Sequence, residues 1–164
     1  MIFNLNGFII GVDVDRTRRF YSKLDEITSS CSCDNCRNYL LATEDFPREV
    51  LEFFNKLGVD VRKAPEVYKI FGCPEENCVY YNGFYHICGE LIKDRRKENI
   101  HDFTDEGATI LTDDDYYSIS DDYSVHFVDD IDLPEEELSL PAFQMEITFS
   151  KVPWKLNKPL SVGR

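Results

Sequence analysis

The stretch Phe143-Gln144-Met145-Glu146-Ile147-Thr148-Phe149 shows the clearest pattern in the chain, because apolar and polar residues alternate along it without interruption. Successive side chains of a β-strand point to opposite sides of a sheet, so this alternation predicts a strand that is buried on one side only. Such a strand is typical of an antiparallel sheet with one covered and one more polar face.

Two asparagine–glycine pairs predict tight turns between further strands. Asn6-Gly7 lies between the apolar segments 3–5 and 8–14, and Asn82-Gly83 lies in the middle of the apolar segment 78–92. Asn-Gly suits a type I′ turn, so each pair predicts a β-hairpin. Short strands are also expected at 26–28, 109–111, 117–119 and 125–128.

Three segments, 34–43, 47–58 and 65–72, have the signals of helices. Asp34 is a typical N-cap residue, and a proline suits the first position of each of the other two segments. Apolar residues recur at helical spacing in segment 47–58, and Gly58 is the expected end of that helix.

Strands near both ends of the chain with helices between them indicate an α+β fold. The expected architecture is a mostly antiparallel sheet, built from hairpins, with two or three helices packed on one face. The chain has 164 residues, about the length of one domain, and no segment resembles a linker. Residues 1–164 are therefore expected to form a single globular domain.

The acidic residues are concentrated in one third of the chain. The formal net charge is -13, yet residues 98–150 hold 16 of the 31 acidic residues and no Lys or Arg. The remaining residues have 15 acidic and 18 basic side chains, so they are close to neutral. A negative field repels nucleic-acid phosphates and anionic lipids and attracts basic proteins or cations. Nucleic acid and membrane are therefore not expected partners.

This charge distribution favours an acidic protein-binding module that captures a basic partner, in the manner of an immunity protein or inhibitor that covers a cationic nuclease. Solubility alone is the simpler explanation of such a charged face. The expected partner-binding residues are Asp113, Asp114, Asp115, Asp121, Asp122, Asp129 and Asp130.

The segment Cys31-Ser32-Cys33-Asp34-Asn35-Cys36 predicts a different function, a structural zinc-binding domain. The two-residue spacing of Cys33 and Cys36 lets both thiolates reach one tetrahedral Zn²⁺, and Cys31 adds a third sulfur. Reduced thiols that hold no metal are the alternative. A closed structural site needs a fourth ligand, for which the sequence offers Cys73, Cys78, His86 and Cys88.

A thiol-dependent enzyme is a third hypothesis. A thiolate at a helix N-terminus has a lowered pKa, and Cys33 and Cys36 lie near an expected one. The three histidines, His86, His101 and His126, are the available bases. No motif places any of them beside a cysteine, so the sequence leans away from an enzyme.

The start of the chain lacks a basic segment followed by a long apolar run, as a signal peptide would have. No apolar stretch approaches the ~20 residues that span a bilayer. A cytoplasmic location is therefore expected, in which the cysteines are reduced or hold a metal.

Four segments resemble parts of a known group of proteins. They are Cys33-Asp34-Asn35-Cys36-Arg37-Asn38-Tyr39, the helix end Leu57-Gly58-Val59-Asp60, Tyr81-Asn82-Gly83-Phe84-Tyr85-His86 and Pro153-Trp154-Lys155-Leu156. Together they resemble a group of small bacterial proteins of unknown function, over residues from about 31 to 156. The resemblance implies no activity and no cofactor.

Overall fold

The computed structural model describes residues 1–97 and 115–162. Its strands are β1 (Ile2–Leu5), β2 (Phe8–Val12), β3 (Glu66–Cys73), β4 (Cys78–Lys93), β5 (Tyr117–Ser120), β6 (Tyr123–Val128) and β7 (Ala142–Pro153). Its α-helices are α1 (Val14–Lys23), α2 (Asp34–Ala42) and α3 (Arg48–Leu57). Short 3₁₀ helices are η1 (Ile27–Ser29), η2 (Thr43–Asp45) and η3 (Arg95–Lys97).

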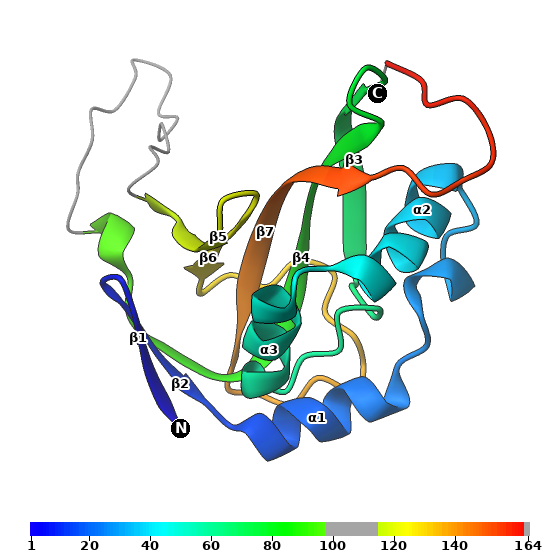
Figure 1. Ribbon diagram of the computed structural model, residues 1–164. Coiled ribbons are helices and arrows are strands. Elements are labelled where there is room, and N and C mark those ends of the chain that lie inside the picture. The colour runs from blue at the N-terminus through cyan, green and yellow to red at the C-terminus, as the bar shows by residue number, and fades with distance from the viewer. Residues whose placement is uncertain (98–114, 163–164) are drawn as a thin grey trace, which may run out of the picture.

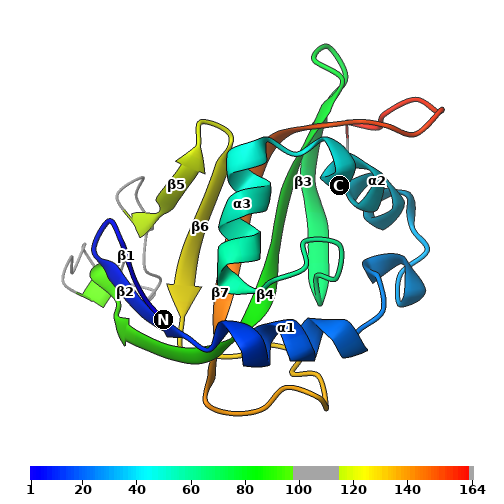
Figure 2. The same cartoon turned by 60° about the horizontal axis from the view of Figure 1, so that its bottom comes forward.

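Within these ranges, the seven strands form one antiparallel sheet in the order β1-β2-β4-β7-β6-β5, and β3 pairs with β4. Helices α1, α2 and α3 lie on one face of this sheet (Figures 1 and 2). The α+β class and the packing of helices on one face are therefore confirmed. No helix in the described ranges is long and apolar enough to cross a membrane.

Strands β4 and β7 form the centre of the sheet. Their register runs from Cys78 opposite Pro153 to Cys88 opposite Ala142. The alternation predicted for β7 is confirmed, because its apolar residues are buried while Glu146 is partly exposed on the other face. The buried apolar set of the predicted stretch is Phe143, Met145, Ile147 and Phe149.

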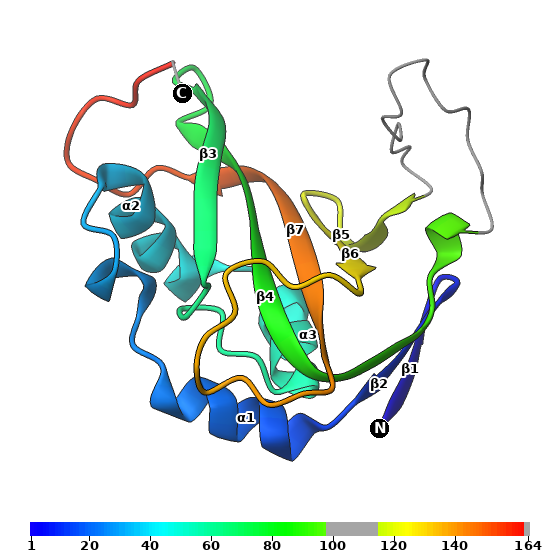
Figure 3. The same ribbon diagram turned by 180° about the vertical axis from the view of Figure 1, so that it is seen from behind.

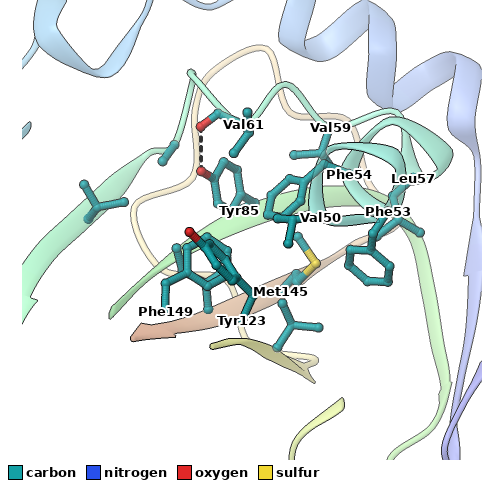
Figure 4. Packing of buried hydrophobic residues seen from close by; sticks show 14 of the residues in the cluster. Val50, Phe53, Phe54, Leu57, Val59, Val61, Tyr85, Tyr123, Met145 and Phe149 are labelled. Carbon is teal, nitrogen blue, oxygen red and sulfur yellow. Dashed lines mark hydrogen bonds between the residues drawn. The ribbon is translucent and has the colours of Figure 1, made fainter. Parts of the chain in front are cut away.

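Helix α3 covers the middle of the sheet with an apolar face. Phe54 packs edge-to-face on Tyr85 of β4, at a centroid distance of 5.0 Å, and on Phe149 of β7, at 6.2 Å (Figure 4). The helix ends at Gly58, whose φ of +79° is the left-handed conformation expected of a C-terminal glycine. Burial of large apolar side chains between helix and sheet is the main source of stability here.

Buried polar groups tie the helices to β4 and β7. The hydroxyl of Tyr85 donates to the carbonyl of Val61 at 2.7 Å and lies 2.6 Å from the hydroxyl of Tyr39 in α2. Asn38, also buried in α2, donates to the carbonyl of Pro153 at 3.2 Å and accepts from the backbone N–H of Lys155 at 2.6 Å. Helix α2 is thereby fixed against the end of β7.

The first predicted hairpin is confirmed, but the second is wrong. Asn6 and Gly7 have φ of 48° and 95° and connect β1 to β2. Asn82-Gly83 instead lies inside the continuous strand β4. A Cβ atom on Gly83 would lie 2.4 Å from the carbonyl oxygen of Glu66, so this glycine permits the close approach of β3 rather than a turn.

Three other local predictions are wrong. Segment 65–72 forms strand β3 instead of a helix, because it pairs with the first half of β4. Segment 26–28 falls in the 3₁₀ helix η1 instead of a strand. Helix α1, which was not predicted, begins at Val14, the last residue of the expected strand 8–14, with Asp13 as N-cap and Phe20 and Tyr21 buried. The strand expected at 109–111 lies outside the described residues.

The face of the sheet opposite the helices is crossed by residues 129–141, which connect β6 to β7 (Figure 3). We call this connection the acidic loop, because it holds six carboxylates and no Lys or Arg. The side chain of Gln144 in β7 accepts from the backbone N–H of Asp132 at 2.8 Å. Nε2 of His86 in β4 lies 2.9 Å from the backbone carbonyl oxygen of Asp132. The loop is therefore bonded to the centre of the sheet.

The substitution Tyr85→Phe is expected to lower the free energy of unfolding by about 1–3 kcal/mol, because it leaves a buried carbonyl and a buried hydroxyl without their partner. Urea denaturation measures this difference. Tyr68→Phe is the matched control, since Tyr68 is 47% exposed, and it should change the free energy little. Equal effects of the two substitutions would contradict the structural role of the Tyr85 hydroxyl.

Candidate functional site

The three cysteines predicted as metal ligands lie together. The Sγ atoms of Cys31, Cys33 and Cys36 all lie within 4.8 Å of one another, and those of Cys31 and Cys33 are 3.2 Å apart. We call these residues the three-cysteine cluster. Cys33 is exposed, Cys31 is half-buried and Cys36 is buried, so the cluster has one side open to solvent.

The start of α2 positions this cluster. Cys33 is the N-cap of the helix, one residue before the predicted N-cap Asp34, and its Sγ accepts from the backbone N–H of Cys36 at 3.4 Å. Cys31 follows the end of η1, and Cys36 lies in the first turn of α2. The N-terminus of a helix has a partial positive charge, which stabilises a thiolate next to it.

The three thiols influence one another's ionisation. The pKa of Cys31 is lowered, because the thiols of Cys36 and Cys33 and the backbone of Cys33 donate hydrogen bonds to its sulfur. The pKa of Cys36 is raised, first by its burial and then by its two neighbours. The cluster therefore favours a thiolate at Cys31 over one at the buried Cys36.

The structure does not bring the other suggested ligands to this cluster. Cys73 and Cys78 face each other across the turn between β3 and β4, and Cys88 is buried beside Thr17. His86 lies under the acidic loop. In residues 1–97 and 115–162, the three-cysteine cluster is the one group of at least three such side chains close enough to share a metal ion.

The predicted acidic residues are distributed over several places. Asp121 and Asp122 form the turn between β5 and β6, while Asp129 and Asp130 begin the acidic loop at the other end of β6. Asp115 is buried, with 2% of its surface exposed. Asp113 and Asp114 lie outside the described residues. The exposed carboxylates that gather in one segment are those of the acidic loop, namely Asp129, Asp130, Asp132, Glu135, Glu136 and Glu137.

Sequence reasoning missed a polar network on the face of the sheet opposite the helices. His126 in β6 and Glu146 in β7 are direct neighbours across the sheet, and Nε2 of His126 lies 3.1 Å from Oε2 of Glu146. Gln144 donates to Oε1 of Glu146 at 3.1 Å and to the carboxylate of Asp132 at 3.1 Å. Polar residues at alternate positions of β7 were the available signal, but the sequence does not show which strands lie beside it.

The histidines of the network bear on the thiol-enzyme hypothesis. His86 and His126 are both buried and bond to Asp132 and Glu146, and neither is hydrogen-bonded to a cysteine. His101 lies outside the described residues. The described geometry thus offers no histidine base to the three-cysteine cluster.

Glu146→Gln is expected to reduce the loss of stability in acid. The pKa of Glu146 is lowered, chiefly because His126 donates a hydrogen bond to its carboxylate. A carboxyl group with a lower pKa in the folded chain contributes stability at neutral pH, which is lost as the pH falls below the unfolded value of about 4.3. Urea unfolding at about pH 7 and about pH 3 should therefore show a smaller difference in free energy for the variant than for the wild type.

Glu49→Gln is the control, because it removes one charge from the exposed surface of α3, on the opposite face of the sheet. It should keep the wild-type difference between the two pH values. A Glu146→Gln variant with an unchanged difference would show that the bond from His126 does not stabilise the ionised carboxylate.

Comparison of the chain with protein-family models, with curated proteins and with solved structures finds no match. The function is therefore inferred from the geometry and charge of the described residues.

Proposed function

We propose that the protein binds a thiophilic metal ion, with Zn²⁺ as the expected ion, through the thiolates of Cys31, Cys33 and Cys36. The observation that carries this proposal is the convergence of three sulfur atoms within 4.8 Å of one another, with Cys33 exposed to solvent. Thiolates are the ligands that zinc and other soft metal ions prefer in proteins.

The spacing of the sulfurs suits such an ion. Zinc–sulfur bonds of about 2.3 Å at tetrahedral angles place sulfur atoms about 3.8 Å apart. The 3.2 Å between Cys31 and Cys33 and the upper limit of 4.8 Å for the cluster lie on either side of that value. The sulfur separations are therefore close to those of a zinc site.

A bound ion would add a direct link between η1 and α2, which already lie against each other. Cys31 follows η1 and Cys36 belongs to α2, so an ion held between them fixes the start of α2. Three protein ligands leave a fourth tetrahedral position, which a water molecule or an added ligand fills in zinc sites of this type. The described residues supply no fourth ligand at the same distance.

Protein purified without added metal, or reconstituted with Zn²⁺ under reducing conditions, is expected to hold about one zinc per chain, because three thiolates provide most of a zinc site. Cys33→Ser and Cys36→Ser should each lose most of this zinc. Elemental analysis after gel filtration measures it. Cys73→Ser is the control, since Cys73 lies outside the cluster, and it should keep the wild-type content.

Two results would contradict the metal site. One is a folded, fully reduced wild-type chain that holds far less than one zinc after reconstitution. The other is an equal loss of zinc in Cys73→Ser and in the cluster variants, because this would show non-specific binding to thiols.

The acidic loop favours a second function, the capture of a basic protein. It presents six exposed carboxylates in one connection that contains no Lys or Arg. A surface of this kind accelerates association with a cationic partner and selects against anionic ones. The backbone of the loop is bonded to β4 and β7 at Asp132.

If the acidic loop is the binding surface, Asp129→Asn/Asp130→Asn should retain less basic protein from a host extract than the wild type at about 0.05 M salt, and retention should fall for both at about 0.5 M. Asp121→Asn/Asp122→Asn removes the same charge at the opposite end of β6 and should retain the wild-type amount. Quantitative mass spectrometry of the retained proteins gives the comparison. Equal retention by both double variants, or retention independent of salt, would exclude the loop as the docking surface.

A further inference from the structure

A cavity of about 480 Å³ opens on the face of the sheet that carries the acidic loop. We call it the open-face pocket. Its lining comes from β3, β4, β6 and β7, together with Tyr116 and the acidic loop. It lies apart from the three-cysteine cluster, since none of the three cysteines lines it.

Apart from His126, which bonds to Glu146, the charged side chains that line the open-face pocket are acidic. Glu66, Asp132 and Glu146 line it, and no Lys or Arg is among the described residues that do. The positive charge of Arg96 also lowers the pKa of Glu146. The guanidinium of Arg96 is bound to the carboxylate of Asp94, at 3.1 Å and 3.0 Å. The pocket therefore has a negative potential that favours a cation and disfavours an anion.

Aromatic side chains line the same pocket. Tyr68 on β3, Phe84 on β4 and Tyr116 before β5 contribute rings to its wall. Tyr68 is 47% exposed, although aromatic rings of this size are more often buried. An ammonium or guanidinium group is attracted to the face of an aromatic ring, and an alkyl stem packs on it.

The carboxylate of Glu146 is held in place before any ligand arrives. His126 bonds to one of its oxygens and Gln144 to the other, each at 3.1 Å. His126 is 5% exposed, and its Nδ1 is buried without a hydrogen-bond partner in the part of the chain that the structure describes. Nε2 of His126 and the amide of Gln144 therefore fix the position and orientation of the Glu146 carboxylate.

We propose that the open-face pocket binds an organic cation, a primary ammonium or a guanidinium group on an alkyl stem. Glu146 pairs with the cationic head, Glu66 and Asp132 add to the negative potential, and Tyr68 packs on the stem. If the network served only to hold the acidic loop, this role would explain the bonds between Gln144 and Asp132. It would not explain why three aromatic and three acidic residues line one cavity.

This proposal is independent of the metal site. It is also independent of protein capture, because a pocket can bind a free amine whether or not the acidic loop holds a protein. The same cationic group occurs in small amines and in the side chains of Lys and Arg, and the titration below distinguishes these two sources.

Titration of the ¹⁵N-labelled protein with butylamine hydrochloride tests the proposal. The backbone amide signals of Glu66, Asn82 and Glu146 should shift, with a dissociation constant on the order of 1 mM, as suits a ligand with so few atoms. Butylguanidine should act in the same way. The isosteric 1-butanol and the anion butyrate should shift these signals at least tenfold less at equal concentration.

Substitutions separate charge pairing from stacking. Glu146→Gln should weaken the binding of butylamine about tenfold, because it removes the paired charge and keeps the shape. Tyr68→Ala should weaken it about threefold and Tyr68→Phe should leave it unchanged, since the ring face is the attracting group. Glu49→Gln, on the opposite face of the sheet, should bind as the wild type does. Thermal unfolding of each variant confirms that it is folded.

Nα-acetyl-lysine methylamide distinguishes the two sources of the cation. Binding at least as tight as that of butylamine assigns the pocket to a side chain of a protein or peptide. Binding at least tenfold weaker assigns it to a small free amine, because the peptide groups are then excluded by the rim. Both results support a cation site.

Three results would overturn the proposal. The first is the absence of shifts at the pocket amides at about 50 mM butylamine, roughly fifty times the expected dissociation constant. The second is equal binding of 1-butanol and butylamine. The third is an equal loss of affinity in Glu49→Gln and Glu146→Gln, because this would show that only the net charge of the protein affects the binding of butylamine.

Discussion

The antiparallel pairing of β4 with β7 is the interaction on which the rest of the structure depends. β2 and β3 are bonded to β4, and β6 is bonded to β7, so each of them is placed by this central pair. Side chains of the pair alternate between the two faces of the sheet. Tyr85 and Met145 thus lie in the apolar core under the helices, while His86, Gln144 and Glu146 lie on the other face. One ladder of backbone bonds positions both the core and the polar network.

The two faces of the sheet bury different kinds of side chains. Under the helices, large aromatic side chains remove apolar area from water, and the few buried hydroxyls and amides find partners in one another or in the backbone. On the opposite face, Gln144 uses both ends of its amide for the acidic loop and for Glu146. Hydrogen bonds that link Asp132, Gln144, Glu146 and His126 in series restrict the movement of each side chain. The network therefore holds the carboxylate of Glu146 in place at the edge of a cavity.

Sequence patterns succeeded where an element depends on its own residues. The turn at Asn6-Gly7, the C-terminal stop at Gly58 and the alternation in β7 follow from local conformational preference and from period, and the structure confirms them. Sequence patterns failed where the conformation of a segment depends on a neighbouring strand. Gly83 is needed because β3 passes within 2.4 Å of where a Cβ would lie, and segment 65–72 is a strand because β4 is available to pair with it. Neither neighbour is visible from a window of sequence.

The sequence by itself determined the α+β class, the three cysteines at ligand spacing and the concentration of net negative charge in one third of the chain. These properties follow from residue order over short distances, and Cys31, Cys33 and Cys36 meet because they are joined by a few bonds. Only the tertiary structure decided that Cys73, Cys78 and Cys88 lie elsewhere and that His126 stands beside Glu146. The reason is physical: β6 and β7 pair through backbone bonds across the connection 129–141, and the register of that pairing carries no local signal.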